Sequence, residues 1–449
     1  MSELFGTDGI RGIAGLAPLD SSTLNALAVA LAELVKEGPS PHRVLIGRDT
    51  RLSGSWIEDQ MTRCLGLNGV EVQSVRVLST PAIAFITKEA DFSAGVVISA
   101  SHNPAQYNGI KVFSRIGAKL ADDLEDRLES RIAALLPSPA REDETADFFS
   151  PGPMNENPVY AAGYEQHLRQ SIGIGLEGMH LVVDCAHGAN WRVAPRLLKE
   201  LGADVTVLGA GPDGENINTA CGSMHPEIMC RTVHESKADV GICFDGDGDR
   251  VILADEQGGV VDGDHVLYLL ARYSDLSPGS REIVGTVMSN LGLEVALKQL
   301  GFALLRAPVG DKFVYEKMLE RGAEIGGEQS GHIIIRKFAS TGDGLLTALQ
   351  VLALVKRHGA PLTALLSGFR KFPQLLLNAQ VSRKPPLEEI DGYAGLLDQA
   401  KAALGEHCRI VVRYSGTEPL LRVMVEGREM AAVEREAHRI MNTLKSRLS

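Results

Sequence analysis

Short apolar runs alternate with amphipathic helical stretches through most of the chain, and this alternation constrains the possible fold more than any other feature. Such alternation is typical of βαβ units, in which helices cover a mostly parallel sheet. The pattern stops and restarts, which gives three similar blocks without a strict residue-level repeat. We therefore expect an α/β protein with three similar mixed α/β domains and a smaller C-terminal α+β domain.

The individual elements are predicted from their hydrophobic period. In the first block we expect strands at residues 43–47, 70–77 and 95–99, and helices at 24–35, 56–67 and 124–136. In the second we expect strands at 181–185, 205–208, 239–244 and 251–254, and helices at 192–201 and 227–236. In the third we expect strands near 283–287, 303–305 and 324–326, and helices near 291–300, 314–320 and 344–355. In the tail we expect strands near 375–381, 410–412 and 421–425, and helices near 393–404 and 431–444.

Two interruptions divide the pattern. Residues 137–158 contain five prolines and an acidic run, which indicates a linker. Residues 359–373 indicate a second boundary. The predicted domains are residues 1–150, 151–250, 251–365 and 366–449.

Composition excludes some classes of partner. The 449 residues carry a net charge of −12, whereas nucleic acids and acidic membranes select basic surfaces. A small anionic ligand remains compatible with this charge, because a few arginines can form a local positive pocket. We expect a small-molecule substrate, no nucleic-acid partner and no membrane partner.

The cysteines and the first residues suggest a compartment. No apolar run reaches the ~18 residues that span a bilayer, and the start of the chain lacks the features of a secretory signal. The six cysteines are scattered without a C-x-x-C pair, which indicates free or buried thiols. We therefore expect a cytoplasmic protein.

The segment Asp245-Gly-Asp-Gly-Asp-Arg250 lies between two predicted strands. Its three carboxylates repel one another unless a cation neutralises them. Oxygen ligands favour a hard divalent ion, with Mg²⁺ ahead of Ca²⁺ or Mn²⁺. An EF-hand is rejected, because Arg250 occupies the position that requires glycine and the flanks are strands. A solvated Asp-Gly turn is the plain alternative.

A polar loop follows the predicted strand at residues 95–99. Ser99 and Ser101 are candidate nucleophiles there, at the end of a strand where open α/β sheets place their sites. His102 suggests a hydrolase, but neighbouring side chains in extended backbone point apart and the chain has no G-x-S-x-G elbow. From this segment alone, a structural serine-rich turn is the better interpretation.

Two more glycine-containing loops carry polar groups. Arg413-Tyr-Ser-Gly-Thr-Glu-Pro419 offers an arginine, hydroxyls and backbone N–H groups for a phosphate, although an ordinary β-turn is equally compatible. In the loop at residues 326–332, Glu328 and Ser330 could bind sugar hydroxyls. The segment at residues 209–214 matches G-x-G-x-x-G but opens no helix, and no P-loop motif occurs.

Taken together, these segments resemble the α-D-phosphohexomutase family. Residues 5–12 resemble its opening motif, and four further segments resemble, in the family's order, its phosphoserine, metal, sugar and phosphate loops: residues 99–104, 245–250, 327–332 and 413–419. Residues 327–331 and 415–419 most resemble the branch that acts on glucosamine phosphates. The resemblance implies four domains around a central active-site cleft.

The resemblance also implies residue roles. Ser101 would carry the phosphoryl group, and Mg²⁺ would be held by Ser101, Asp245, Asp247 and Asp249. The implied catalytic residues are Arg11, Ser101, His102, Lys111 and Arg250, with Lys111 transferring the proton of the sugar hydroxyl. The implied substrate-binding residues are Lys312, Glu328, Ser330, Arg413, Ser415, Gly416, Thr417 and Arg422.

The implied reaction interconverts glucosamine 6-phosphate and glucosamine 1-phosphate. It passes through a bisphosphorylated sugar, with glucosamine 1,6-bisphosphate or glucose 1,6-bisphosphate as activator, and supplies UDP-N-acetylglucosamine for cell-wall synthesis. A monomer or homodimer is expected. The alternatives are a phosphomannomutase/phosphoglucomutase of the same family, a Mg²⁺-dependent sugar phosphatase and a noncatalytic sugar-phosphate sensor.

Overall fold

The computed structural model describes residues 4–6, 9–136, 152–276, 280–415 and 419–448. The chain forms two compact units, Met1–Met288 with Leu305–Leu366, and Ser289–Leu304 with Ser367–Ser449. None of the described helices is long and apolar enough to cross a membrane.

The first sheet of the larger unit has the strand order β1-β5-β4-β2-β3. Its strands are β1 (Ile10–Ile13), β2 (Arg43–Arg48), β3 (Glu71–Val77), β4 (Ala94–Ile98) and β5 (Tyr107–Ser114). β2 pairs in parallel with β3 and β4, whereas β5 pairs antiparallel with β4 and β1. The sheet is therefore mixed rather than mostly parallel.

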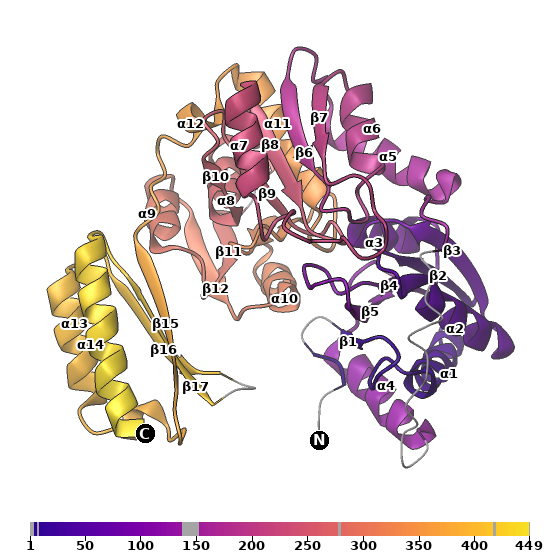
Figure 1. Ribbon diagram of the computed structural model, residues 1–449, viewed down its shortest axis with the longest axis horizontal. Coiled ribbons are helices and arrows are strands. Elements are labelled where there is room, and N and C mark those ends of the chain that lie inside the picture. The colour runs from indigo at the N-terminus through magenta and orange to yellow at the C-terminus, as the bar shows by residue number, and fades with distance from the viewer. Residues whose placement is uncertain (1–3, 7–8, 137–151, 277–279, 416–418, 449) are drawn as a thin grey trace. The chain divides into compact units, whose positions relative to one another are not determined.

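Helices cover both faces of this sheet. α1 (Ser21–Glu37), α2 (Gly54–Leu67) and α4 (Asp122–Leu135) share one apolar core with alternate residues of β2 and β4, and the three helices lie together in Figure 1. α3 (Thr80–Glu89) packs on the opposite face. The period of Leu24, Leu27 and Leu31 directs α1 toward the sheet. Alternation along each strand supplies both cores.

The second and third sheets repeat this arrangement. The second has the order β10-β9-β8-β6-β7, and the third has the order β12-β11-β13-β14. Their strands are β6 (His180–Asp184), β7 (Asp204–Leu208), β8 (Val240–Phe244), β9 (Val251–Ala254), β10 (Val260–Val261), β11 (Glu282–Thr286), β12 (Ala303–Ala307), β13 (Ile325–Gly327) and β14 (Ile333–Ile335). The accompanying helices are α5 (Pro158–Ile172), α6 (Val193–Glu200), α7 (Glu227–Ser236), α8 (Gly263–Tyr273), α10 (Asp311–Arg321), α11 (Gly344–His358) and α12 (Leu362–Leu365).

One position recurs in all three sheets. In each, a strand that is parallel to its neighbour on one side pairs antiparallel with the next strand along the chain: β4 with β5, β8 with β9, and β13 with β14. The three connecting loops contain Ser101, Asp245–Arg250 of the acidic motif, and Glu328. The topology therefore places three predicted functional loops at equivalent positions.

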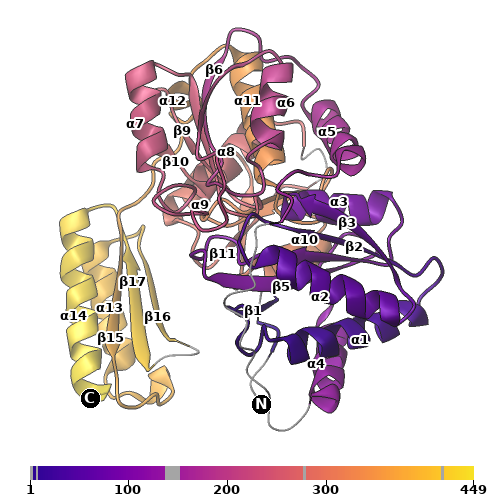
Figure 2. The same ribbon diagram turned by 45° about the vertical axis from the view of Figure 1, so that its right-hand side comes forward.

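The smaller unit contains an antiparallel sheet of order β15-β17-β16, formed by Gln374–Gln380, Leu420–Glu426 and Arg409–Tyr414. Figure 2 shows α13 (Tyr393–Leu404) and α14 (Met430–Leu448) on one face of it. α9 (Leu291–Gln299) also belongs to this unit, and its N-cap Asn290 donates a hydrogen bond of 3.1 Å to Glu426 of β17. A short 3₁₀ helix spans Leu387–Glu389.

The fold class predicted from sequence is confirmed: three mixed α/β domains and a smaller C-terminal α+β domain. The predicted domain limits stay predictions. The linker prediction falls mostly on residues 137–151, outside the described residues, and α5 begins at Pro158. Among the described elements, the hydrophobic pattern did not predict β1, α3, β5, α5, α8, β10, β14, α12 or the 3₁₀ helix at Leu387–Glu389.

Candidate active site

Ser101 lies in the loop after β4 and is almost completely buried. Its φ of +53° is in the left-handed region, which residues other than glycine rarely adopt. Its backbone N–H donates to Ser99 Oγ at 2.9 Å, and its Oγ donates to Asp245 Oδ2 at 2.6 Å. The loop conformation therefore directs the serine hydroxyl at the first aspartate of the acidic motif.

The side chain of His102 lies beside that of Ser101, whereas extended backbone would have directed the two side chains apart. Because Ser101 is left-handed rather than extended, His102 Nδ1 lies 3.3 Å from Ser101 Oγ. Burial, followed by the charges of Arg250 and Arg11, lowers the pKa of His102 to about 4. The imidazole is therefore neutral near pH 7. Of the two contacts of Ser101 Oγ, the one with Asp245 Oδ2, at 2.6 Å, is shorter than the one with His102 Nδ1.

Asp245, Asp247 and Asp249 form a buried carboxylate cluster. One oxygen from each lies within 4.8 Å of the others. Asp247 Oδ1 is buried and accepts no hydrogen bond from the described residues, and Asp249 Oδ1 has only the more distant His332 Nδ1, at 3.6 Å, and Arg250 Nε, at 3.8 Å. Buried carboxylate oxygens without donors fit a bound divalent cation.

The three carboxylates have different electrostatic surroundings. Burial and the charges of Asp249 and Asp247 raise the pKa of Asp245 well above its ordinary value. Burial opposes the ionisation of Asp249 as well, but Lys111, His332 and Arg250 hold its pKa well below the ordinary range. A cation at the cluster would therefore relieve repulsion mainly at Asp245.

Two elements of the first domain bind the loop at Asp245–Arg250, the predicted metal loop. Thr80 at the start of α3 donates through Oγ1 to Asp247 Oδ2 at 2.6 Å and through its N–H to Asp247 O at 2.9 Å. Lys111 on β5 places Nζ 3.0 Å from Asp247 Oδ2 and 3.2 Å from Asp249 Oδ2. The antiparallel strand that the sequence pattern missed thus carries the predicted proton-transfer residue into the cluster.

Gly246 permits the close approach of the two loops. A Cβ at this position would lie 2.6 Å from Ser101 O, closer than real Cβ atoms approach backbone oxygen. Any larger residue would therefore push the metal loop away from the serine loop.

A small cavity of about 150 Å³ adjoins the cluster. Its lining comes from Arg11, Asp249, Arg250, Val309, Gly310, Asp311, Glu328 and His332. Glu328 is buried and accepts a hydrogen bond of 3.0 Å from Gly310 N. The structure thus brings Arg11, Arg250 and Glu328 together beside the acidic cluster. The cavity they line has the size and polarity to bind part of a small polar ligand.

The other predicted residues of the third domain lie differently. Ser330 is exposed in the same loop as Glu328. Lys312 does not line the cavity; its Nζ forms ion pairs with Glu125, at 2.7 Å, and with Asp122 of α4. In this conformation Lys312 therefore links α10 to the first domain.

The smaller unit contains the predicted phosphate-binding residues. Arg413 on β16 is directly opposite Arg422 on β17. Two like charges at paired positions destabilise a sheet unless an anion compensates them. Ser415 is buried, and its carbonyl accepts a hydrogen bond of 2.8 Å from Lys384 Nζ. Gly416 and Thr417 lie outside the described residues.

Sequence reasoning missed several residues that the structure brings to the site. They are Asp49, Arg51, Thr80, Asp311 and His332. His332 belongs to a loop that the motif analysis quoted but assigned no role. The polar run that directly follows the predicted strand at residues 43–47 was the available signal for Asp49 and Arg51.

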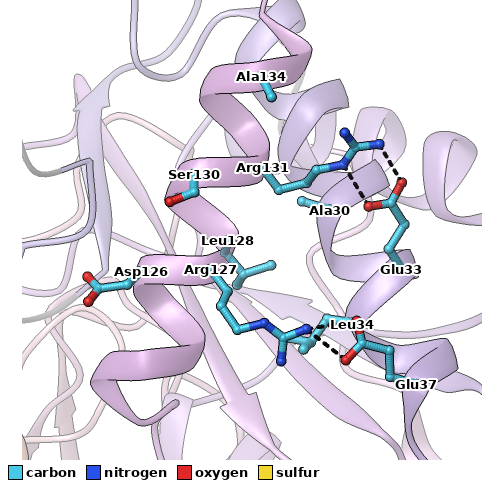
Figure 3. Close-up of a pocket in the computed structure, with 10 residues that line it drawn as sticks. All are labelled: Ala30, Glu33, Leu34, Glu37, Asp126, Arg127, Leu128, Ser130, Arg131 and Ala134. Carbon is cyan, nitrogen blue, oxygen red and sulfur yellow. Dashed lines mark hydrogen bonds and ion pairs between the residues drawn. The ribbon is translucent and has the colours of Figure 1, made fainter.

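A larger groove elsewhere lacks this chemistry. It has a volume of about 510 Å³ and lies between α1 and α4 (Figure 3). Its charged side chains pair with one another: Arg127 with Glu37 at 2.7 Å, and Arg131 with Glu33 at 2.8 Å. None of the residues predicted for catalysis or binding lines it.

Asp343 lies next to a residue that binds the loop at Asp245–Arg250, and its ionisation makes the stability of this region depend on pH. It caps α11, accepts a hydrogen bond of 2.8 Å from the Tyr164 hydroxyl, and precedes Gly344, whose N–H donates to Gly248 O at 3.1 Å. Burial raises the pKa of Asp343 to about 6, from 3.8. Between these values the folded protein keeps a proton that the unfolded chain releases. The stabilising contribution is therefore complete below about pH 4 and is lost as the pH rises through about 6.

An Asp343→Asn variant lacks this titration. We expect the free energy of unfolding of the wild type, relative to the variant, to fall by about 2–3 kcal/mol between pH 4 and pH 7. Urea unfolding of both proteins at several pH values measures the difference. A difference that is independent of pH would contradict the assignment.

Comparisons with known proteins agree with this arrangement. Models of four domains of the phosphoglucomutase/phosphomannomutase family match the chain: α/β/α domain I at residues 2–137, domain II at 161–259, domain III at 262–372 and the C-terminal domain at 376–443. A phosphoglucosamine mutase of Desulfotalea psychrophila is 44% identical, over 96% of each chain. One of Anaeromyxobacter dehalogenans is 45% identical, over 94% of each chain.

Solved structures show the same fold. A phosphoglucomutase/phosphomannomutase family protein of Burkholderia thailandensis is 25% identical with a TM-score of 0.77, and the match covers 99% of this chain and 98% of that one. The Aspergillus fumigatus N-acetylphosphoglucosamine mutase, solved with GlcNAc-6P and magnesium, is 18% identical with a TM-score of 0.61, covering 99% and 96%. The chain belongs to the phosphoglucomutase/phosphomannomutase family. It is an enzyme, a mutase that transfers a phosphoryl group.

Proposed function

We propose that this chain interconverts glucosamine 6-phosphate and glucosamine 1-phosphate through phosphorylated Ser101. The observation that carries the proposal is the hydroxyl of Ser101 buried against Asp245, inside a carboxylate cluster that fits a divalent cation. Relatives at 44–45% identity over nearly the whole chain are phosphoglucosamine mutases, which supports the amino sugar as substrate.

In the first half-reaction, the Oγ–P bond of phosphorylated Ser101 breaks and a P–O bond forms to the free sugar hydroxyl. The hydroxyl proton leaves through Lys111, and Ser101 Oγ regains a proton. The product is glucosamine 1,6-bisphosphate. After the sugar turns, the other phosphoryl group returns to Ser101, which leaves glucosamine 1-phosphate.

The chain's own residues act on charge and position. Arg11 and Arg250, which line the cavity, stabilise the negative charge of the transferring group. Neutral His102 contributes a hydrogen-bonding nitrogen 3.3 Å from Ser101 Oγ. Glu328 and Ser330 bind sugar hydroxyls, and Lys312, at the start of α10, is a further substrate-binding residue. These roles are assigned by position and by resemblance.

Asp245, Asp247 and Asp249, with a phosphoserine oxygen, are the proposed ligands of Mg²⁺, which would neutralise charge on the phosphoryl oxygens. In the smaller unit, Arg413 and Arg422 bind the phosphate group that is not transferred, and Ser415, Gly416 and Thr417 complete that cradle. Binding energy from this remote phosphate orients the reacting end of the sugar.

The activator is glucosamine 1,6-bisphosphate or glucose 1,6-bisphosphate, either of which phosphorylates Ser101 directly. We assign the enzyme to the cytoplasm, consistent with its six free thiols, and to the supply of UDP-N-acetylglucosamine. A monomer or homodimer is proposed.

A substrate comparison tests the proposal. With Mg²⁺ and a trace of glucose 1,6-bisphosphate, we expect kcat/KM for glucosamine 6-phosphate to exceed that for glucose or mannose 6-phosphate by about tenfold or more, as for a site that hydrogen-bonds one substituent. A higher kcat/KM for glucose 6-phosphate or mannose 6-phosphate would instead support the phosphomannomutase/phosphoglucomutase alternative. Release of inorganic phosphate without isomerisation would favour a phosphatase.

A further inference from the structure

Arg51 is a fully buried arginine with no place in the mechanism so far. It follows β2, and its guanidinium has five N–H donors in a rigid plane. All five have an acceptor: Nε–H donates to Asp49 Oδ2 at 2.8 Å, and the terminal nitrogens donate to the carbonyl oxygens of Ser101 (2.8 Å), Asn103 (2.8 Å), Pro104 (2.5 Å) and Tyr107 (2.9 Å).

Three of the four carbonyl groups belong to the connection that carries Ser101 from β4 to β5, and the fourth, that of Tyr107, begins β5. One side chain therefore binds four backbone carbonyl groups in and next to the phosphoserine loop. Without it, each of these carbonyl oxygens would lose a donor. Asn218 Nδ2 would still donate to Ser101 O at 2.9 Å and to Asn103 O at 3.1 Å, but the left-handed conformation of Ser101 would lose one of its supports.

Asp49 extends the same network to the other side of Ser101. Its Oδ1 accepts from Arg51 N at 2.9 Å, and its Oδ2 accepts from Ser99 Oγ at 2.6 Å. Ser99 Oγ in turn accepts the N–H of Ser101 at 2.9 Å. Asp49 and Arg51 thus hold both the N–H and the C=O of Ser101.

We propose that Arg51, aligned by Asp49, is the positioning residue of the phosphoserine loop and holds Ser101 Oγ in line with the sugar oxygen that receives the phosphoryl group. The proposal rests on the proposed function, because it assumes that Ser101 donates the phosphoryl group. Arg51 does not line the cavity beside the metal loop, so it acts through Ser101 rather than on the sugar.

This role predicts a separation of kinetic effects. Phosphoryl transfer depends on alignment of the acceptor oxygen, the phosphorus and Ser101 Oγ, and a misplacement of about 1 Å can cost about 100-fold in rate. Substrate binding relies on other residues. Loss of Arg51 should therefore lower kcat and leave KM nearly unchanged.

Arg51→Lys is the sharpest variant. Lysine keeps the positive charge beside Asp49 but lacks the planar fork, so it cannot donate to four separated carbonyl groups. Arg48→Lys is the matched control. Arg48 is equally buried at the end of β2 and bonds Glu58 and the carbonyls of Asp49 and Pro153, and none of its hydrogen bonds among the described residues reaches the phosphoserine loop.

Both variants and the wild type are phosphorylated with glucose 1,6-bisphosphate and mixed with glucosamine 6-phosphate. Loss of phosphoserine is followed by intact mass, together with steady-state kcat, KM and Tm. For Arg51→Lys we expect about a 100-fold fall in kcat and in the single-turnover transfer rate, with KM changed less than about threefold. For Arg48→Lys we expect both rates within about threefold of wild type, even at an equal loss of Tm.

An Arg51→Lys protein that keeps wild-type transfer would overturn the proposal. An equal fall in kcat for Arg51→Lys and Arg48→Lys at an equal loss of Tm would also overturn it, because that result would indicate a general effect of replacing a buried arginine. If Arg51→Lys does not fold, Asp49→Asn tests the same network and must show the same KM-sparing fall in kcat. A wild-type protein that transfers no phosphoryl group from Ser101 refutes the proposed function, whereas an active wild type with an indifferent Arg51→Lys refutes only this inference.

Discussion

We expect the replacement of Ser101 with alanine to abolish mutase turnover and to leave the protein unphosphorylated after incubation with glucose 1,6-bisphosphate. We expect turnover to fall by at least about four orders of magnitude, because removal of a covalent nucleophile removes the pathway itself. The loss should not come from unfolding. The methyl group of alanine fits the space of the hydroxymethyl group, and only the hydrogen bonds of Oγ to Asp245 and His102 disappear.

Ser114→Ala is a suitable control for this variant. Ser114 ends β5 in the same domain, and its Oγ donates to Ala118 O at 2.9 Å, outside the serine loop. Coupled spectrophotometric turnover and intact mass measure both proteins. An Ser101→Ala protein with activity near that of Ser114→Ala would contradict the phosphoserine mechanism.

Replacing Asp245 with asparagine should change activity and stability in opposite directions. Activity should fall by about 100-fold or more and need a higher Mg²⁺ concentration, because one ligand and one negative charge are lost from the cluster. The metal-free variant, by contrast, should be more stable than the metal-free wild type by about 1 kcal/mol or more. Burial and two neighbouring carboxylates raise the pKa of Asp245, so its ionised form is costly in the folded state.

Thermal unfolding with EDTA and with increasing Mg²⁺ measures this pair of effects. Added Mg²⁺ should raise the Tm of the wild type clearly and that of Asp245→Asn only weakly. Asp255→Asn is the control, because Asp255 lies in the turn after β9 and accepts hydrogen bonds from Gln257 N and Gly259 N. Equal Mg²⁺ responses in the wild type and Asp245→Asn would contradict the proposed ligand set.

The periodic part of the fold followed from the sequence because it depends on apolar spacing alone. The helix predicted at residues 227–236 coincides with α7, and the strand predicted at 251–254 coincides with β9. β5 was missed for the opposite reason. It is almost fully buried but contains Asn108, which donates to Ser53 Oγ, and Lys111, which donates to Asp247, so its polar side chains are bonded by protein groups rather than by water.

The candidate site was predictable where residues that cooperate are adjacent in sequence. The three aspartates of the acidic motif fall within five residues, so their mutual repulsion was visible without a structure. Arg51 and Thr80 act on loops that lie 50 and 167 residues away, and single-sequence patterns contain no record of such pairings. The position of the His102 side chain was predicted wrongly because the prediction assumed extended backbone, whereas the backbone of Ser101 is in the left-handed conformation.

The most direct test follows the phosphoryl group itself. The protein is labelled with ³²P at Ser101 and mixed with an equal amount of unlabelled glucosamine 6-phosphate and Mg²⁺ in a single turnover. We predict that the label leaves the protein and appears in glucosamine 1,6-bisphosphate and then in glucosamine monophosphate, with little inorganic phosphate. Label released as inorganic phosphate while the sugar phosphate stays unchanged would contradict the account.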